Sequence, residues 1–154
     1  MTNSKLAAPD IRWSGQTHLG KVRPNNEDAF LGLSFSGHDV QYLGKTGEAS
    51  ITNTDFVFAV SDGMGGAQSG EFASRITIEK LSHWLPKSFQ VSAQGVSVNQ
   101  TDILDEVFLS IHAELLKLSR SYEECRDMGT TLSMGWFTPE RMYFGHIGDS
   151  RIYH

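Results

Sequence analysis

The sequence predicts an α+β fold, with antiparallel strands before and after two helices. Three observations lead to this class. Strand-like runs occur at residues 28–35 and 56–60, the second of them rich in aromatic and β-branched residues. Apolar residues recur at helical spacing between residues 72 and 118, and strand-like runs return at residues 130–147. The sequence lacks the regular strand–helix–strand alternation of a parallel α/β fold. With 154 residues, the chain is expected to be one domain or part of one.

Strands separated by turns are expected in the first part of the chain. Polar and apolar residues mix in short runs over residues 11–19, and residues 28–35 predict a second strand. Residues 40–43 suit a short strand that completes a hairpin with it. The run at residues 56–60 is continuously apolar, which predicts a strand covered on both faces. This strand is expected to end at Ser61.

Two amphipathic helices are expected next. Apolar residues recur at helical spacing over residues 72–85, and Pro86 is expected to end that helix. The polar stretch at residues 87–100 predicts a loop. A second apolar face follows over residues 104–118. The N-cap of this second helix is expected at Thr101 or Asp102.

The last part of the chain is expected to return to strands. Residues 130–137 and 141–147 predict two strands, joined by a turn at residues 138–141 in which proline holds the second position. Gly148 opens another turn, and residues 151–154 are expected to begin a further strand. His146 lies within a predicted strand and is expected to be a core residue with its polar atoms satisfied. The six histidines form no H-x-x-x-H pair, so a zinc site is not supported.

The composition excludes several classes of protein. The 13 Lys and Arg against 18 Asp and Glu give a net charge of −5, which argues against nucleic acid or an anionic membrane as a partner. Residues 1–10 predict a polar tail without a signal peptide's apolar core, and no run approaches the ~20 apolar residues of a spanning helix. Cys125 is the single cysteine, which favours a reducing, cytoplasmic setting. The expected domain is residues 11–154.

A first candidate site is the segment Arg-Pro-Asn-Asn-Glu-Asp, which begins at Arg23. Glu27 and Asp28 are adjacent at the mouth of a predicted strand and therefore point to opposite sides, so one can face a metal ion while the other holds water or a neighbour. Arg23 offers a planar fork of donors that suits phosphate. Taken alone, such a segment is more often a polar loop with one ion pair.

Three further motifs contain glycine. Asp62 and Gly63 open the segment Asp-Gly-Met-Gly-Gly after a buried strand, where a carboxylate and a glycine carbonyl can hold a divalent cation. The alternative for this segment is a glycine turn that joins a strand to a helix. Gly-Thr-Thr-Leu occupies residues 129–132, and Gly-Asp-Ser-Arg occupies residues 148–151. Each of these two is more often a structural turn, in which Asp149 would bond its own backbone.

Taken together and in this order, the four motifs resemble those of the metal-dependent protein serine/threonine phosphatases of the PP2C type. The resemblance runs over residues 11–154, and Met64 matches the bacterial form of the motif. It implies a central antiparallel β-sandwich flanked by helices on both outer faces, in α-β-β-α layers, with a metal site at one end. It also implies hydrolysis of phosphoserine and phosphothreonine in proteins, by a metal-activated water, and an opposing serine/threonine kinase.

The resemblance also implies roles for individual residues. Asp62 would bridge two Mn²⁺ or Mg²⁺ ions, and Gly63 would supply a carbonyl ligand. Glu27 and Asp28 would reach the metals directly or through water. Arg23 would bind the phosphate. Asp149 resembles the aspartate with which some members of this family bind a third metal ion. Residues 129–132 match a motif that we interpret as structural.

Members of this family continue beyond the Gly-Asp-Ser-Arg strand to further strands and to two later aspartate motifs. The sequence in hand holds neither, so the implied fold is incomplete at the C-terminus. Two interpretations follow: the chain is the N-terminal part of a phosphatase domain, or it is a shorter non-catalytic module that binds a phosphoprotein or a regulatory partner. We expect the 154-residue chain alone to associate and to show negligible metal-dependent activity.

Overall fold

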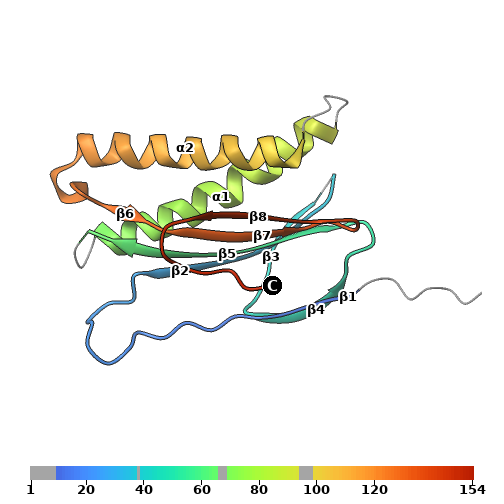
Figure 1. Cartoon of the computed structure of the whole chain (residues 1–154), viewed down its shortest axis with the longest axis horizontal. Coiled ribbons are helices and arrows are strands. Elements are labelled where there is room, and N and C mark those ends of the chain that lie inside the picture. The colour runs from blue at the N-terminus through green and yellow to red at the C-terminus, as the bar shows by residue number, and fades with distance from the viewer. Residues whose placement is uncertain (1–9, 38, 66–68, 94–98) are drawn as a thin grey trace, which may run out of the picture.

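An antiparallel sheet of six strands is the main element of this computed structural model (Figure 1), which describes residues 10–37, 39–65, 69–93 and 99–154. The strands are β1 (Asp10–Ser14), β2 (Asp28–Phe35), β3 (Val40–Tyr42), β4 (Thr46–Ser50), β5 (Asp55–Met64), β6 (Gly129–Thr130), β7 (Leu132–Phe137) and β8 (Met142–Ile147). The helices are α1 (Ser69–Ala93), α2 (Gln100–Ser121) and the short 3₁₀ helix η1 (Glu123–Cys125). The α+β prediction is confirmed.

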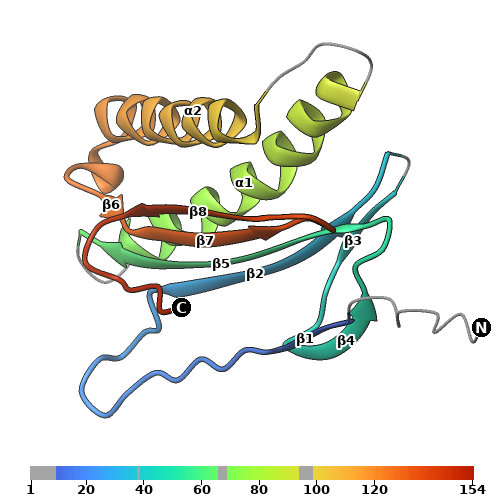
Figure 2. The same ribbon diagram turned by 45° about the vertical axis from the view of Figure 1, so that its right-hand side comes forward.

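The strands form two sheets of unequal size. The large sheet has the order β3-β2-β5-β7-β8, with β6 paired to the end of β5, and β1 pairs with β4 in a separate two-stranded sheet. Figure 2 shows α1 and α2 on one side of the large sheet and the β1–β4 pair on the other. Within the described residues, both long helices therefore cover the same face. None of the helices described is long and apolar enough to cross a membrane.

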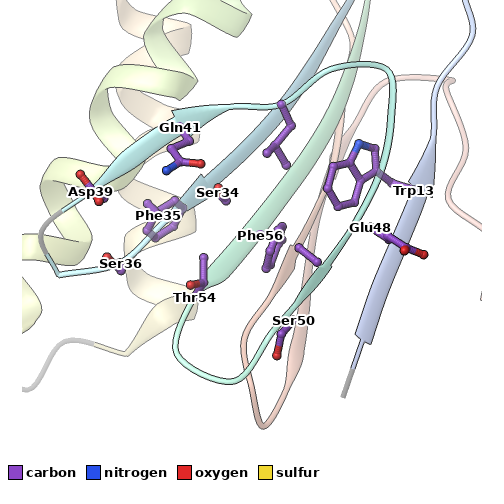
Figure 3. Close-up of a pocket in the computed structure, with 12 residues that line it drawn as sticks. Trp13, Ser34, Phe35, Ser36, Asp39, Gln41, Glu48, Ser50, Thr54 and Phe56 are labelled. Carbon is purple, nitrogen blue, oxygen red and sulfur yellow. The ribbon is translucent and has the colours of Figure 1, made fainter. Parts of the chain in front are cut away.

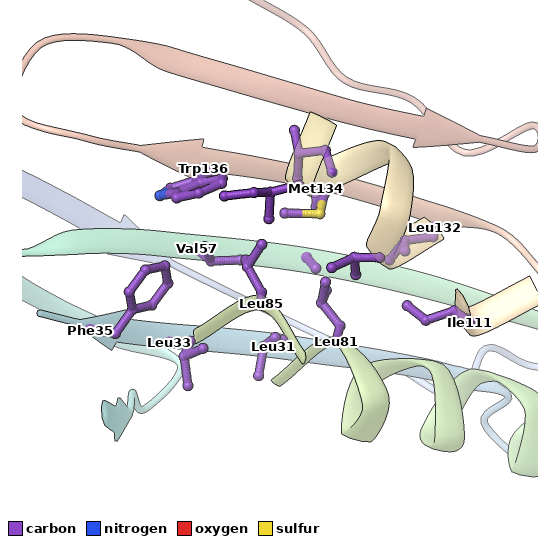
Figure 4. Close-up of a cluster of buried hydrophobic side chains, with 14 residues drawn as sticks. Leu31, Leu33, Phe35, Val57, Leu81, Leu85, Ile111, Leu132, Met134 and Trp136 are labelled. Atoms are coloured by element: carbon purple, nitrogen blue, oxygen red, sulfur yellow. The ribbon is translucent and has the colours of Figure 1, made fainter. Parts of the chain in front are cut away.

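The hydrophobic core lies between the large sheet and the helices (Figure 4). Strand β5 is at its centre because β2 and β7 pair with it on either side. Its residues alternate: Val57 and Ala59 face the helices, whereas Phe56 and Phe58 lie against the ring of Trp13. The buried core cluster comprises Leu31, Leu33, Phe35, Val57, Ala59, Leu81, Leu85, Ile103, Leu104, Val107, Ile111, Leu132, Met134 and Trp136.

Strand β5 differs from its prediction in two ways. Val60 is 45% exposed, because the Trp13 side of the sheet is covered only over the first part of the strand. The prediction that both faces are covered is therefore wrong for the second part. The strand also continues past Ser61 to Met64. Pairing explains this length, since Asp62 lies opposite Asp28 of β2 and Gly63 lies opposite Thr130 of β6.

Helix α1 continues through Pro86, where the sequence predicted its end. Residues on either side of the proline explain the difference. Leu85 is fully buried, and the ring of Phe89 packs 5.1 Å from the ring of Phe35. Burial of these side chains offsets the backbone hydrogen bond that a proline removes. The loop predicted at residues 87–100 is thus helical up to Ala93.

The N-cap of α2 is Asn99, whose side chain accepts a hydrogen bond from the Thr101 amide at 3.3 Å. The predicted caps, Thr101 and Asp102, lie in the first turn instead.

Some predictions fall on residues that the structure does not describe. The predicted polar tail is one of them, apart from Asp10. Residues 94–98 of the predicted loop and Gly66 of the second motif lie outside the described residues as well.

The end of the chain differs from its prediction in two places. Residues 151–154 do not form a strand. His146 is exposed instead of lying in the core, although its Nδ1 is 2.8 Å from the Ser133 hydroxyl and is therefore satisfied. The turn at residues 138–141 is confirmed, since the Thr138 amide donates to the Arg141 carbonyl at 2.9 Å.

A buried polar pair fixes the beginning of β5. Asp55 is 7% exposed, and the indole N–H of the fully buried Trp136 donates to its Oδ2 at 2.8 Å. Burial raises the pKa of the Asp55 carboxyl above its ordinary value, and the hydrogen bond from Trp136 opposes that shift. The fold therefore favours the protonated form of Asp55.

We expect Asp55→Asn to raise the free energy of unfolding near neutral pH by on the order of 1 kcal/mol, because the amide still accepts the indole N–H while the buried charge is lost. The gain should shrink near the ordinary carboxyl pKa. The pKa of Asp55 is higher in the folded state than in the unfolded state. Protonation of Asp55 therefore stabilises the unaltered protein fully at pH values below the unfolded-state pKa, and this stability is lost as the pH rises through the folded-state pKa. Thermal melts at both pH values measure this, and a pH-independent difference would contradict it.

The matched control for this pair is Asp55→Leu, which leaves the Trp136 N–H without its acceptor. It should lower the free energy of unfolding by about 1–3 kcal/mol at either pH.

Candidate active site

The four sequence motifs meet at one end of the large sheet. Strand β2 begins there at Asp28, and β5 ends there with Asp62, Gly63 and Met64. Asp28 and Asp62 are directly opposite each other in the antiparallel ladder, and Gly63 is opposite Thr130 of β6. Residues 148–151 follow β8 at the same end, since Ile147 pairs with Leu132. Backbone pairing therefore brings together segments that lie far apart in the sequence.

The acidic residues line two neighbouring clefts. Glu27 lines a cleft of about 360 Å³, and Asp28 lines a second cleft of about 480 Å³. Asp62 lines both of them. Glu27 and Asp28 therefore face different sides, as expected for adjacent residues at the start of a strand. Arg23, Gly63 and Asp149 join Glu27 and Asp62 in the first cleft.

Glu27 is held in place from two directions. Its Oε2 is 2.9 Å from Nη1 of Arg23, and its side chain is only 11% exposed while that of Arg23 is 67% exposed. Gly70, in the first turn of α1, lies against the carboxylate, because a Cβ there would come within 3.1 Å of Glu27 Cδ and Oε2. A carboxylate beside a helix N-terminus is stabilised by the helix dipole.

Position 63 requires a glycine, because the backbone of β5 packs closely against the backbone of α1 there. A Cβ at this position would collide with the carbonyl group of Gly70. The Gly63 amide also donates to the Glu27 carbonyl at 3.1 Å. Strand β5 is thus pressed directly onto the first turn of α1, and the segment that carries Asp62 has a fixed position.

Two threonines hold the backbone of Asp62. The Asp62 amide donates to Thr131 Oγ1 at 3.0 Å, and the Asp62 carbonyl accepts from the Thr131 amide and the Thr130 hydroxyl, each at 2.9 Å. Thr131 Oγ1 is also 2.7 Å from the hydroxyl of Ser150. The structure therefore links the second, third and fourth motifs through Thr131. Sequence reasoning included Thr131 in the motif at residues 129–132, which it interpreted as structural, but it did not assign this residue a role of its own.

Negative charge accumulates around Asp28. Burial raises the pKa of its carboxyl above the ordinary value, and the neighbouring charges of Asp62 and Glu27 raise it further, while Arg23 opposes the shift. Asp28 and Asp62 have no ion-pair partner among the described residues. A positive ligand at this end of the sheet would relieve their repulsion.

The donors available to a metal ion are oxygen atoms. Across the described part of the chain, no group of three or more His, Cys, Asp or Glu side chains is placed to hold a metal ion. The residues nevertheless suit a hard cation in kind, because Mg²⁺ is commonly held by one or two carboxylates and several waters. Asp149 is exposed at the edge of the cleft and is not hydrogen-bonded to another described residue through its side chain.

Comparison with known proteins identifies the family. A family model described as protein phosphatase 2C matches residues 45–154. The chain belongs to the protein phosphatase 2C family. Its fold is similar to that of a solved serine/threonine phosphatase from S. agalactiae, with a TM-score of 0.53 and 23% identity over 92% of this chain and 48% of that one.

Bacterial protein phosphatases are similar to the chain in sequence. The protein phosphatase PhpP of Streptococcus pneumoniae is 29% identical over 137 residues, which cover 88% of this chain and 47% of PhpP. The serine/threonine protein phosphatase PstP of Mycobacterium tuberculosis is 29% identical over 146 residues, which cover 93% of this chain and 22% of PstP. The chain spans about half or less of the length of these relatives.

We expect Thr131→Val to loosen the site in this protein phosphatase 2C chain, because it leaves the Asp62 amide and Ser150 without their shared partner. The free energy of unfolding should fall by about 1–3 kcal/mol, and hydrogen exchange of the Asp62 amide should become faster. Thr131→Ser keeps the hydroxyl and is the control. Equal exchange rates at Asp62 in the two variants would show that the hydroxyl does not hold this backbone.

Proposed function

We propose that this chain supplies phosphate-binding and metal-binding residues to the active site of a metal-dependent protein serine/threonine phosphatase. One observation carries the proposal: Arg23, Glu27, Asp62, Gly63 and Asp149 line a single cleft at the end of the sheet. Family membership and the names of the relatives support protein dephosphorylation as the reaction. A serine/threonine kinase that acts on the same substrates is the expected opposing partner.

We assign the metal-binding roles by position in the site. Asp62 is the central ligand, because it alone of the acidic residues lines both clefts. Glu27 and Asp28 flank it on opposite sides, and the carbonyl group of Gly63 adds a neutral oxygen. Asp149 stands at the edge, where a third ion would bind. Mn²⁺ or Mg²⁺ suits these donors, because hard divalent cations prefer carboxylate and carbonyl oxygens.

A divalent cation held by these residues would supply Lewis acidity and lower the pKa of a bound water. The chain's own groups bind and orient the phosphate. Arg23 uses one N–H group for Glu27, so its other donors are free to bind phosphoryl oxygens and offset their developing charge. Met64 is 56% exposed beside the cleft, and its thioether cannot donate a proton to a leaving group. The proton must therefore come from water or from another residue.

One observation favours a second candidate function. The described residues do not provide a set of three metal-ligating side chains. A non-catalytic module would not need such a set. Such a module would bind a phosphoprotein or a regulatory partner through Arg23 without hydrolysing it. Activity measurements separate the two functions.

We expect Asp62→Asn to lower Mn²⁺-dependent hydrolysis of a phosphopeptide by at least about 100-fold, because the amide keeps the shape but not the charge of the carboxylate. The assay uses the natural polypeptide that carries residues 1–154, and circular dichroism verifies folding. Asp105→Asn, at an exposed position of α2, is the control. Near-normal turnover in Asp62→Asn would contradict the assigned role, and no turnover in the unaltered protein would favour the non-catalytic module.

We expect Arg23→Ala to raise the KM for phosphopeptide by about tenfold and to leave the Mn²⁺ concentration for half-maximal activity nearly unchanged, because a bidentate cationic contact to phosphate is lost. Arg75→Ala is the matched control, since Arg75 also forms an i,i+4 ion pair, with Glu71. If Arg23→Ala changes the Mn²⁺ requirement more than the KM, the residue acts on the metal site through Glu27 instead.

A further inference from the structure

A further cavity, separate from the two clefts of the candidate active site, lies at the opposite end of the sheet. Its volume is about 380 Å³, and it opens between the β1–β4 sheet and the face of the large sheet that the helices leave free (Figure 3). Phe56, near the start of β5, lines it, whereas Asp62 lies near the end of the same strand. The sequence motifs that point to phosphatase chemistry contribute none of its lining residues.

A serine hydroxyl without a hydrogen-bond partner among the described residues faces the cavity. Ser34 of β2 is 6% exposed and lines the cavity. It lies between Gln41 of β3 and Phe56 of β5 in the ladder, so the three side chains share the face that turns away from the helices. No described residue forms a hydrogen bond with its side chain. The hydroxyl itself is open to the cavity, since Ser34 is not among the described side chains with a fully buried, unpaired polar atom. A ligand in the cavity that carries N–H groups can therefore donate a hydrogen bond to it.

The charge of the cavity is negative. Asp39 and Glu48 are the two charged residues among those that line it, and both are acidic. Glu48 has a partner in Arg12, at 3.1 Å, but both side chains are largely exposed, so this pair is weak. Asp39 has no ion-pair partner in the described part of the chain. Trp13 and Phe56, with ring centroids 5.9 Å apart, provide apolar walls.

We propose that this cavity binds an arginine side chain of a peptide segment in extended conformation. The apolar walls suit the methylene stem, the unpaired carboxylate of Asp39 attracts the guanidinium, and the Ser34 hydroxyl can accept an N–H group. A peptide is favoured over a free amine because β3 lies at an edge of the sheet beside the cavity. An edge strand offers backbone groups to an added strand. The inference does not depend on the proposed phosphatase function.

Binding is measured by NMR titration of the natural polypeptide that carries residues 1–154, without metal ions, with the unphosphorylated peptide acetyl-Ala-Val-Arg-Val-Ala-amide. The same peptide with citrulline in place of arginine keeps the shape and removes the charge. We expect the arginine peptide to bind at least about fivefold more tightly than the citrulline peptide, with weakening at higher salt. The largest amide shifts should occur at Ser34, Gln41 and Trp13.

Two variants and one control locate the contact. Asp39→Asn and Ser34→Ala should each weaken binding of the arginine peptide by about three- to fivefold. Glu106→Gln removes an exposed carboxylate on α2, across the sheet from the cavity, and should change nothing. Equal affinity for the two peptides, equal effects of Asp39→Asn and Glu106→Gln, or largest shifts around Asp62 would each overturn the proposal. None of these results bears on phosphatase activity.

Discussion

The contact between Gly63 of β5 and Gly70 of α1 holds the large sheet and its helices together at the end where the acidic residues meet. Any side chain at Gly63 would collide with the backbone of Gly70, and a side chain at Gly70 would press on the Glu27 carboxylate. Two backbones can approach this closely only where both residues lack a Cβ. The position of Asp62, the ion pair of Glu27 with Arg23 and the shape of the cleft all depend on this contact.

The sequence predicted those parts of the fold that depend on local pattern. Strand β2 was predicted with its observed bounds, because an apolar run with β-forming residues begins after a polar segment and ends at a glycine turn. The buried face of α2 was predicted from helical spacing, since Leu104, Val107 and Ile111 follow one another by three or four residues. The four site segments were identified from their residue types, and their roles remain predictions.

Features that depend on distant contacts could not be predicted from the sequence. Pro86 is a local signal for the end of a helix, but the burial of Leu85 and Phe89 against the sheet outweighs it. Strand β4 carries no clear apolar run, and it forms because β1, more than 30 residues earlier, pairs with it. Thr131 shows its importance only when β6 and β7 are placed beside Asp62. In each case the deciding partner lies outside any local window.

The carboxylates of Asp28 and Asp62 destabilise the fold where they face each other. This destabilising arrangement supports a binding role more strongly than any single motif does. Like charges directly opposite each other on antiparallel strands are destabilising, and Asp28 and Asp62 are such a pair. Burial raises the pKa of the Asp28 carboxyl, and the charge of Asp62 raises it further. A polar loop with one ion pair would explain Arg23 and Glu27, but it gives no reason for two further carboxylates that face each other. Unfavourable arrangements of this kind concentrate at functional sites, and a bound cation would turn the repulsion into a source of affinity.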